Sequence, residues 1–559
     1  MEGHENILTE LALSNGAHPF SDFNTALQFF VSSSRSDIHR KKLTIAPFFN
    51  YLSSLFQNNV QDKSDSYKLI CTILKIARNL CAGEITNQTS FIHDGGLEIT
   101  ASLAKKIILH GSCNPDLTPE SLDVCQMILQ LLGNVCLAGE EQLAAVWRTF
   151  FPEVFVGFAG IQNAKIYEPL CMVICTSCQD NQCRLKELCG NNGCPIIAGI
   201  LRTSQTGTVG IEWAWLGLLT KICFVKPYFV QLFISLRAQE ASSVRVEAGN
   251  DTFSSEQAHL LHLIANFATD QMEEFSLLVN SRECKPVLRE FVTSVVEIVW
   301  KSERIINFRP ENPLTLPTGL PAIDILGYSL NILRDMCACE DSPSFSVDIH
   351  QIQETGTFSV VDSLVSSGLI KLMIHLLQEL GPPETVEKAM RQASLGSSSP
   401  SPKDVKLEGM AGGIHRETSA NTLADTFGNS SLLHAGDKDW MSHVDQKRKV
   451  CPYKGYRRDI VSVLANATFR RKHVQDQIRE CGALLLLLQQ CVVDEKNPFL
   501  REWGLWAVRN LLEGNRENQQ EVAELELQNY VNTPAITEIG LRVEIDPNSR
   551  KPKLVNLDS

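Results

Sequence analysis

Hydrophobic positions repeat with helical spacing over most of the chain. One face of the segment 499–512 is apolar at i, i+3, i+7 and i+11, at Leu500, Trp503, Ala507 and Leu511. The preceding segment 483–490 is apolar almost throughout, which is typical of a buried central helix, and 474–480 is short and amphipathic. Residues 474–512 therefore predict a unit of three helices, the first short, the second buried and the third long.

The pattern of the third helix recurs in seven more segments. They are 73–81, 128–136, 170–178, 215–223, 260–268, 328–337 and 461–469. Five of these eight helices carry an asparagine near their end, at Asn79, Asn134, Asn266, Asn466 and Asn510. The motif Arg-Asn-Leu-x-x-Gly-x-x-x-Asn-Gln occurs at residues 78–88 and again at 509–519. We therefore predict an all-α fold, a right-handed superhelical solenoid of about eight irregular repeats that resembles armadillo-repeat proteins.

Three polar stretches interrupt the repeats, at 237–256, 307–321 and 381–449. The longest is rich in Gly, Ser and Pro and cannot bury enough apolar surface to fold alone. We predict an N-terminal array at 1–380, a flexible insert at 381–449 and a C-terminal domain at 450–559. Within the insert, Ser399 and Ser401 each precede a proline and are candidate phosphorylation sites.

Composition narrows the class of protein. The net charge of −13 argues against a dedicated nucleic-acid binder, which is usually basic. No apolar run is long enough to predict insertion into a membrane. The eighteen cysteines, without a secretory-signal pattern at the start, indicate reduced thiols of a cytosolic or nuclear protein.

Six cysteines fall between Cys171 and Cys194, and three roles are open for them. The spacing Cys175-x-x-Cys178 is that of half a zinc site. A reversible thiol role is the second alternative. We favour the third, in which cysteines fill a helical core, because 173–178 has a helical pattern whereas zinc ligands usually lie on turns.

Two roles are also open for the recurring asparagines. An amide both donates and accepts, which suits it to bind the backbone of a peptide in a groove. Alternatively, it bonds a neighbouring carbonyl and holds the repeats in register. The candidate groove residues are Trp503, Trp506, Arg509, Asn510, Asn466, Arg470, Asn79, Asn134 and Asn266. Because a tryptophan one turn before the asparagine occurs only at Trp506, we expect Trp503 and Trp506 to serve core packing and one local contact.

The stretch 447–473 is basic in an otherwise acidic chain, with nine Lys or Arg residues and one acid, Asp459. A solvated face is the simplest interpretation, and an acidic partner is the alternative. No phosphate-binding loop, zinc-protease motif or nucleophile elbow is present in the sequence. We therefore predict no catalysis, no cofactor and no metal site.

Blocks in the last hundred residues resemble the C-terminal domain of the ataxin-10 family. They are 453–457 (YKGYR), Leu464-x-Asn466, 474–476, 497–500, 502–503, 508–511 and 518–519. Before about residue 380 only the armadillo pattern is similar. The insert and the tail at 541–547 are more similar to those of plant-type relatives.

The resemblance implies a non-enzymatic scaffold that binds protein partners and self-associates. It also implies a role in cytokinesis, cell division and signalling, in the cytoplasm and at perinuclear, centrosome or midbody sites. Implied partners are the O-linked N-acetylglucosamine transferase and components of G-protein signalling, without nucleic acid. Two alternatives remain: an armadillo-type nucleotide-exchange factor for a chaperone or G protein, and a nuclear-import adaptor.

Overall fold

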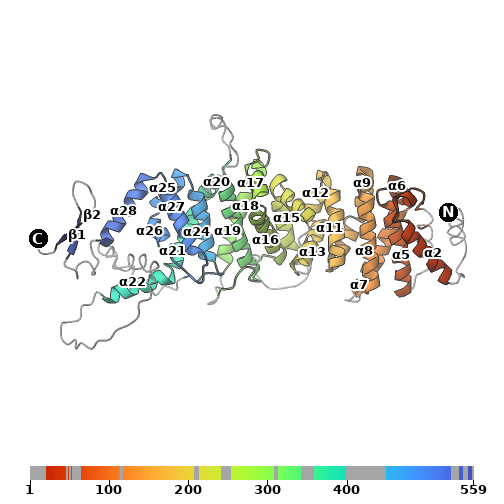
Figure 1. Ribbon diagram of the computed structural model, residues 1–559, viewed down its shortest axis with the longest axis horizontal. Helices are drawn as coiled ribbons and strands as arrows, with labels where there is room; N and C mark the ends of the chain where they lie inside the picture. Colours follow the sequence, from red (N-terminus) through yellow and green to blue (C-terminus); the bar gives the residue numbers. More distant parts are fainter. Residues whose placement is uncertain are drawn as a thin grey trace, which may run out of the picture. The chain divides into compact units, whose positions relative to one another are not determined.

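The computed structural model describes residues 20–45, 48, 52, 64–113, 117–206, 213–240, 253–306, 313–340, 358–396, 449–530, 541–545 and 552–556. These residues belong to two compact units, Met1–Gly249 (unit 1) and Asn250–Ser559 (unit 2). Figure 1 shows that both units are built of packed helices. The predicted all-α helical-repeat architecture is confirmed, whereas the hand of the superhelix stays a prediction. Ser399 and Ser401 lie outside the described residues.

Unit 1 contains four third helices that pack side by side in the order α5, α8, α11 and α14 (Figure 1). The third helices are α5 (Ser64–Cys81), α8 (Pro119–Cys136), α11 (Ala164–Cys178) and α14 (Trp213–Thr220). The other helices are α2 (Phe20–Ser33), α3 (Asp37–Arg40), α6 (Ile85–His93), α7 (Gly96–Cys113), α9 (Glu140–Phe150), α10 (Glu153–Gly160), α12 (Gln182–Cys189), α13 (Cys194–Gln205) and α15 (Phe229–Glu240). The predicted helix at 215–223 changes to a π-helical turn, η1 (Lys221–Val225).

Unit 2 repeats the arrangement with α16, α19, α24 and α27. These third helices are α16 (Ser255–Asp270), α19 (Pro321–Cys339), α24 (Tyr456–Thr468) and α27 (Leu500–Leu512). The other helices are α17 (Met272–Asn280), α18 (Lys285–Ile305), α20 (Val360–Ser366), α21 (Leu369–Leu380), α22 (Glu384–Gly396), α25 (Lys472–Glu480), α26 (Leu484–Leu488) and α28 (Arg516–Tyr530).

Local sequence explains where several helices begin. The Oγ1 of Thr118 accepts from the backbone nitrogen of Ser121 at 3.3 Å, and Pro119 occupies the first turn of α8. Ser254 and Gln257 form a reciprocal capping box at the start of α16. The apolar faces of these helices then pack against neighbouring third helices, which stabilises each row of helices.

The structure differs from the predicted segment boundaries at two points. The insert predicted at 381–449 begins with a helix, α22, whose apolar face the sequence pattern did not reveal. Beyond the helical repeats, the tail forms an antiparallel hairpin, β1 (Leu541–Ile545) with β2 (Pro552–Asn556). The boundary between compact units falls near residue 250, and the predicted C-terminal domain shares unit 2 with α16–α22 because α24 packs on α19.

The predicted unit at 474–512 is confirmed with a shorter middle helix. That helix, α26, has five residues, and α27 crosses its end at Gly504. A Cβ at Gly504 would lie 2.7 Å from the carbonyl oxygen of Gln490, so a side chain there would push the two segments apart. Phe499, which precedes α27, has a φ of 65° and therefore lies outside the helix.

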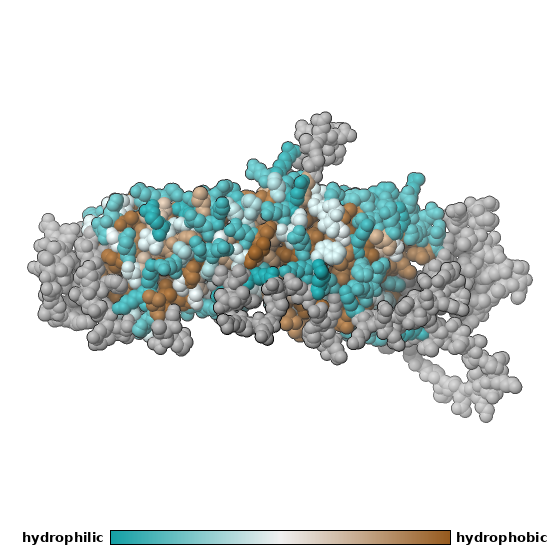
Figure 2. All heavy atoms as spheres, turned by 180° about the vertical axis from the view of Figure 1, so that it is seen from behind, coloured by the Kyte–Doolittle hydropathy of each residue, from teal (hydrophilic) through white to brown (hydrophobic). Residues whose placement is uncertain are grey.

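No single described helix is long and apolar enough to span a membrane. Two bent pairs meet the criteria of length and composition together, Ala214–Val225 with Phe229–Arg237 and Val360–Ser366 with Leu369–Leu380. Figure 2 shows one face of the molecule, on which apolar side chains form separate patches among hydrophilic ones.

Candidate functional site

Asparagines near the ends of the third helices connect neighbouring helices of unit 2. The Nδ2 of Asn466 donates to the backbone carbonyl of Arg334 at 3.0 Å, and that of Asn510 donates to the carbonyl of Ala465 at 2.8 Å. Each acceptor immediately precedes the corresponding position of the preceding third helix, Asp335 or Asn466. These bonds fix the register of successive repeats. Asn510 is fully buried.

Unit 1 uses the same bond once. The Nδ2 of Asn134 donates to the carbonyl of Arg78 at 2.8 Å, and Arg78 directly precedes Asn79. Asn266 instead contacts His262 of its own helix, at 3.1 Å. The bond to a neighbouring carbonyl, one of the two roles left open by the sequence, therefore describes three of the five asparagines. Binding of a peptide backbone by these residues stays a prediction.

A second contact between repeats comes from glutamines nine residues after the asparagine. The Nε2 of Gln88 donates at 2.8 Å to the carbonyl of Cys81 in its own repeat and at 2.8 Å to that of Asn134 in the next. The Nε2 of Gln475 donates in the same way, at 3.4 Å to a backbone carbonyl of its own repeat and at 2.8 Å to the carbonyl of Asn510. Both glutamines are 2% exposed. We assigned them no role from the sequence, although the signal was present in the recurring motif.

Gln519 holds the same position in the last repeat, but its environment differs. Its Nε2 donates to the carbonyl of Leu512 at 2.6 Å, the bond inside its own repeat. No second hydrogen bond joins the side chain of Gln519 to another residue of the described chain, and that side chain is exposed. The glutamine of the last repeat therefore makes the contact within its own repeat but lacks the contact to a following repeat.

The exposed side of α27 carries apolar side chains. Trp506 is 40% exposed, and the guanidinium of Arg509 lies 4.8 Å from the centre of its ring. Leu505 is also exposed, whereas Trp503 is half-buried. The expectation that Trp506 serves core packing was wrong, because the face of α27 toward α24 is formed by other positions. Leu500, Ala507 and Leu511 are buried apolar residues of α27.

Of the eight described Lys, Arg and His side chains in the stretch 447–473, five form ion pairs inside unit 2. The ion pairs are Lys449–Glu379, Arg458–Asp459, Arg471–Glu340, Lys472–Glu517 and His473–Asp362. Arg470 is exposed, and its guanidinium lies 4.9 Å from the ring centre of Phe469. The stretch therefore mainly stabilises the packing of its own unit.

The single acid of this stretch is buried in a polar cluster. Tyr453 donates to Asp459 at 2.9 Å, and the Nε of Arg458 donates at 2.7 Å. Burial raises the pKa of Asp459, whereas Arg458, Tyr453 and Arg334 oppose that rise. The cluster joins α19, α24 and the segment before α24.

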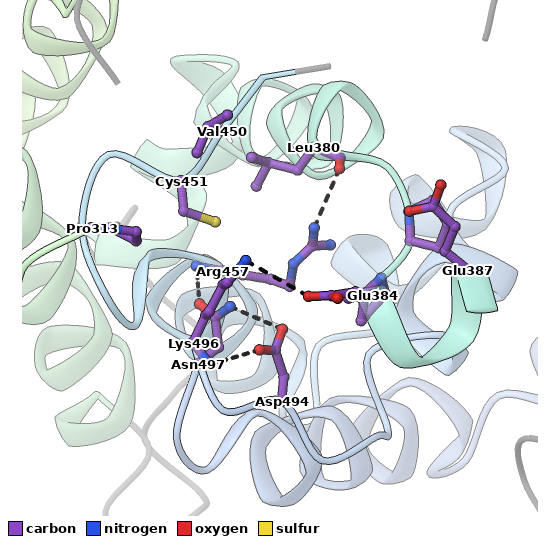
Figure 3. A pocket seen from close by; sticks show the side chains of 12 residues that line it. Pro313, Leu380, Glu384, Glu387, Val450, Cys451, Arg457, Asp494, Lys496 and Asn497 are labelled. Carbon is purple, nitrogen blue, oxygen red and sulfur yellow. Dashed lines mark hydrogen bonds and ion pairs between the residues drawn. The ribbon is translucent and has the colours of Figure 1, made fainter. Parts of the chain in front are cut away.

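A small cavity lies where α21 ends and α24 begins, as Figure 3 shows. Its volume is about 230 Å³. Arg457 extends into it and donates to the carbonyl of Gly381 at 2.8 Å and to the Oε1 of Gln490 at 3.1 Å. The carbonyl of Leu380 lies 3.4 Å from the same guanidinium (Figure 3). Arg457 therefore binds carbonyls at the C-terminus of α21, where the helix dipole favours a cation, and ties α21 to α24.

The cysteines of the 171–194 stretch are buried, apart from Cys183. Burial raises the pKa of Cys189 to about 12, and that of Cys178 is raised by burial and by neighbouring thiols. Protonated, buried thiols fill the core of unit 1. Among the described residues, no group of three or more His, Cys, Asp or Glu side chains is placed to hold a metal ion.

Comparisons with known proteins find relatives that match most of the chain and others that match only its end. A family model described as the spinocerebellar ataxia type 10 protein domain matches residues 456–555. Ataxin-10 of Pongo abelii and of Homo sapiens are each 23% identical over 490 residues, 87% of this chain and 82% of the relative. The ataxin-10 homolog of Dictyostelium discoideum is 34% identical over 95 residues, 17% of this chain and 16% of the relative. Residues 456–555 therefore match the domain of the ataxin-10 family, and most of the chain is similar to ataxin-10 proteins.

Proposed function

We propose that this chain is a non-catalytic helical-repeat scaffold that binds proteins and self-associates through the end of unit 2. The observation that supports self-association is Gln519. Gln88 and Gln475 each donate to the carbonyl of a following third helix, and Gln519 is exposed without such an acceptor. The name of the matching family model also refers to homo-association.

In this proposal a second copy supplies the backbone carbonyl that Gln519 lacks. Similarity to the ataxin-10 family further supports a regulatory role in cytokinesis, cell division and signalling, in the cytoplasm and at perinuclear, centrosome or midbody sites. It also supports the O-linked N-acetylglucosamine transferase and G-protein signalling components as partners. These finer roles rest on the family alone.

The test is sedimentation velocity of the full chain and of two matched variants. Gln519→Arg places a charge at the proposed contact, whereas Gln520→Arg places the same charge on the next exposed residue. We expect Gln519→Arg to weaken self-association by about tenfold and Gln520→Arg by less than about twofold. A chain that stays monomeric at about 100 μM, or equal effects of the two variants, would overturn the proposal.

A further inference from the structure

Four cations gather on one face of unit 1, and we call them the cationic face: Arg35, Lys75, Arg78 and Lys165. Lys75 and Arg78 lie one turn apart on α5. Burial and Asp123 raise the pKa of the half-buried Cys71, whereas Lys75, Arg78 and Lys165 lower it, so these charges surround one thiol. Asp123 is itself bound to Lys165 at 2.6 Å.

Within the described part of the chain, the side-chain contacts of Arg78 are all to neutral atoms. Its Nη1 donates to the Oε1 of Gln130 at 2.6 Å and lies 3.7 Å from the sulfur of Met127. Its Nη2 donates to the Oδ1 of Asn79 at 2.9 Å. Burial and then the like charge of Arg35 lower the pKa of Arg78. The guanidinium is therefore oriented without being neutralised.

An arginine at the same position of another third helix, in unit 2, shows the contrast. Arg334 occupies the same position on α19, but the next residue is Asp335 instead of asparagine. The Nε of Arg334 donates to the Oδ1 of Asp335 at 2.7 Å, so that charge is compensated. On α5 the corresponding residue, Asn79, also accepts a hydrogen bond from the preceding arginine. Because asparagine is neutral, the positive charge of Arg78 is not compensated.

Two neighbouring residues add uncompensated charge. Lys75 is half-buried, and the side chain of Arg35 is exposed. Neither side chain forms a hydrogen bond or ion pair with another described residue. In a chain of net charge −13, this face is therefore a local positive region.

Amides continue the surface onto α8. Gln126 and Gln130 lie one turn apart and are half-buried. The side chain of Gln126 and the Nε2 of Gln130 form no hydrogen bond with another described residue, which leaves donors and an acceptor for a peptide backbone. Packed helices lie about 10 Å apart, so the face spans about 20 Å from α5 to Lys165 on α11. An extended peptide of about six residues covers that length.

We infer that the cationic face binds an acidic peptide segment of a partner protein. Carboxylates of the peptide pair with Arg78 and Lys75, and its backbone contacts the amides of α8. Spaced cations with amides between them fit a peptide better than a single phosphate, which would engage one cation. The inference rests on the proposed protein-binding function but is independent of self-association.

The test is fluorescence polarisation of the full chain with a labelled, end-capped peptide of four Ser-Glu repeats. A peptide of four Ser-Gln repeats measures binding without charge. We expect Lys75→Gln to weaken binding of the acidic peptide by about fivefold and Arg78→Gln by about tenfold. Lys186→Gln removes an equal charge from an exposed position of α12 and should change affinity by less than about twofold.

Three controls separate the outcomes. Arg78→Lys keeps the charge and should recover part of the affinity lost in Arg78→Gln, which distinguishes binding from misfolding. Gln519→Arg should leave peptide affinity unchanged, so self-association and peptide binding can fail separately. Equal affinity for the two peptides would overturn the inference. Tighter binding of a single-stranded oligonucleotide, with the same dependence on Lys75 and Arg78, would also overturn it in favour of nucleic acid.

Discussion

The substitution Asn510→Ala is expected to loosen the contact between α24 and α27. The amide is fully buried and donates to the carbonyl of Ala465 at 2.8 Å. Losing a hydrogen bond of this kind costs about 1 kcal/mol, and the small cavity left by alanine adds to it. The carbonyl of Ala465 keeps a bond from Thr468, and the Oδ1 of Asn510 has no hydrogen-bond partner, so both limit the cost. We expect a loss of about 1.5 kcal/mol.

Hydrogen exchange of the full chain, followed by mass spectrometry, measures this loss of stability at the helices concerned. Because about 1.4 kcal/mol corresponds to a factor of ten, amides of α27 should exchange about tenfold faster. A whole-chain melting curve is less informative, since two compact units need not unfold together. Asn266→Ala is the matched control, because among the described residues the side chain of Asn266 bonds within its own helix, and the substitution should cost less than about 0.5 kcal/mol. Equal effects of the two substitutions would refute the idea that Asn510 connects repeats.

Three further predictions follow from buried or constrained positions. Burial lowers the pKa of His259 to about 4, so on acidification the unfolded chain binds a proton at a higher pH than the folded chain does. The stability that the neutral ring contributes is therefore complete above pH 6.5 and is lost as the pH falls toward 4. Exchange in α16, corrected for intrinsic rates, should therefore accelerate across that window, and His259→Gln should abolish the acceleration. Gly504→Ala should destabilise unit 2 by about 2 kcal/mol in hydrogen exchange, because its Cβ would meet a backbone carbonyl. Phe499 has a left-handed backbone conformation, and its side chain is 69% exposed. Phe499→Gly should therefore relieve the backbone strain and slow hydrogen exchange at the start of α27, whereas Phe499→Ala should not.

Several elements followed from the sequence because their causes are local. The helix spacing of apolar residues in 73–81, 128–136 and 461–469 needs only the chain itself, and α5, α8 and α24 contain these segments. The short α26 and the hairpin of β1 and β2 did not follow. Their extent depends on which segments pack against them, as the close approach of Gly504 to Gln490 illustrates.

The candidate sites divide in the same way. Asparagines and glutamines recur visibly in the motif at 78–88, so the sequence pointed to the right residues. Their acceptors are backbone carbonyls of the next repeat, and a carbonyl has no side-chain signature by which it can be recognised in a sequence. The exposed position of Trp506 depended on the rotation of α27 against α24, which is likewise a property of packing.

The sequence by itself determined that this chain is a helical-repeat protein and which family its C-terminal blocks resemble. Periodicity and short motifs encode both, since they act within one helix. Only the tertiary structure decided which polar groups are already satisfied and which remain available. Asn510 and Gln475 are satisfied inside unit 2, whereas Arg78 keeps its charge and Gln519 lacks a second acceptor. That distinction depends on neighbours distant in the chain, which only packing brings together.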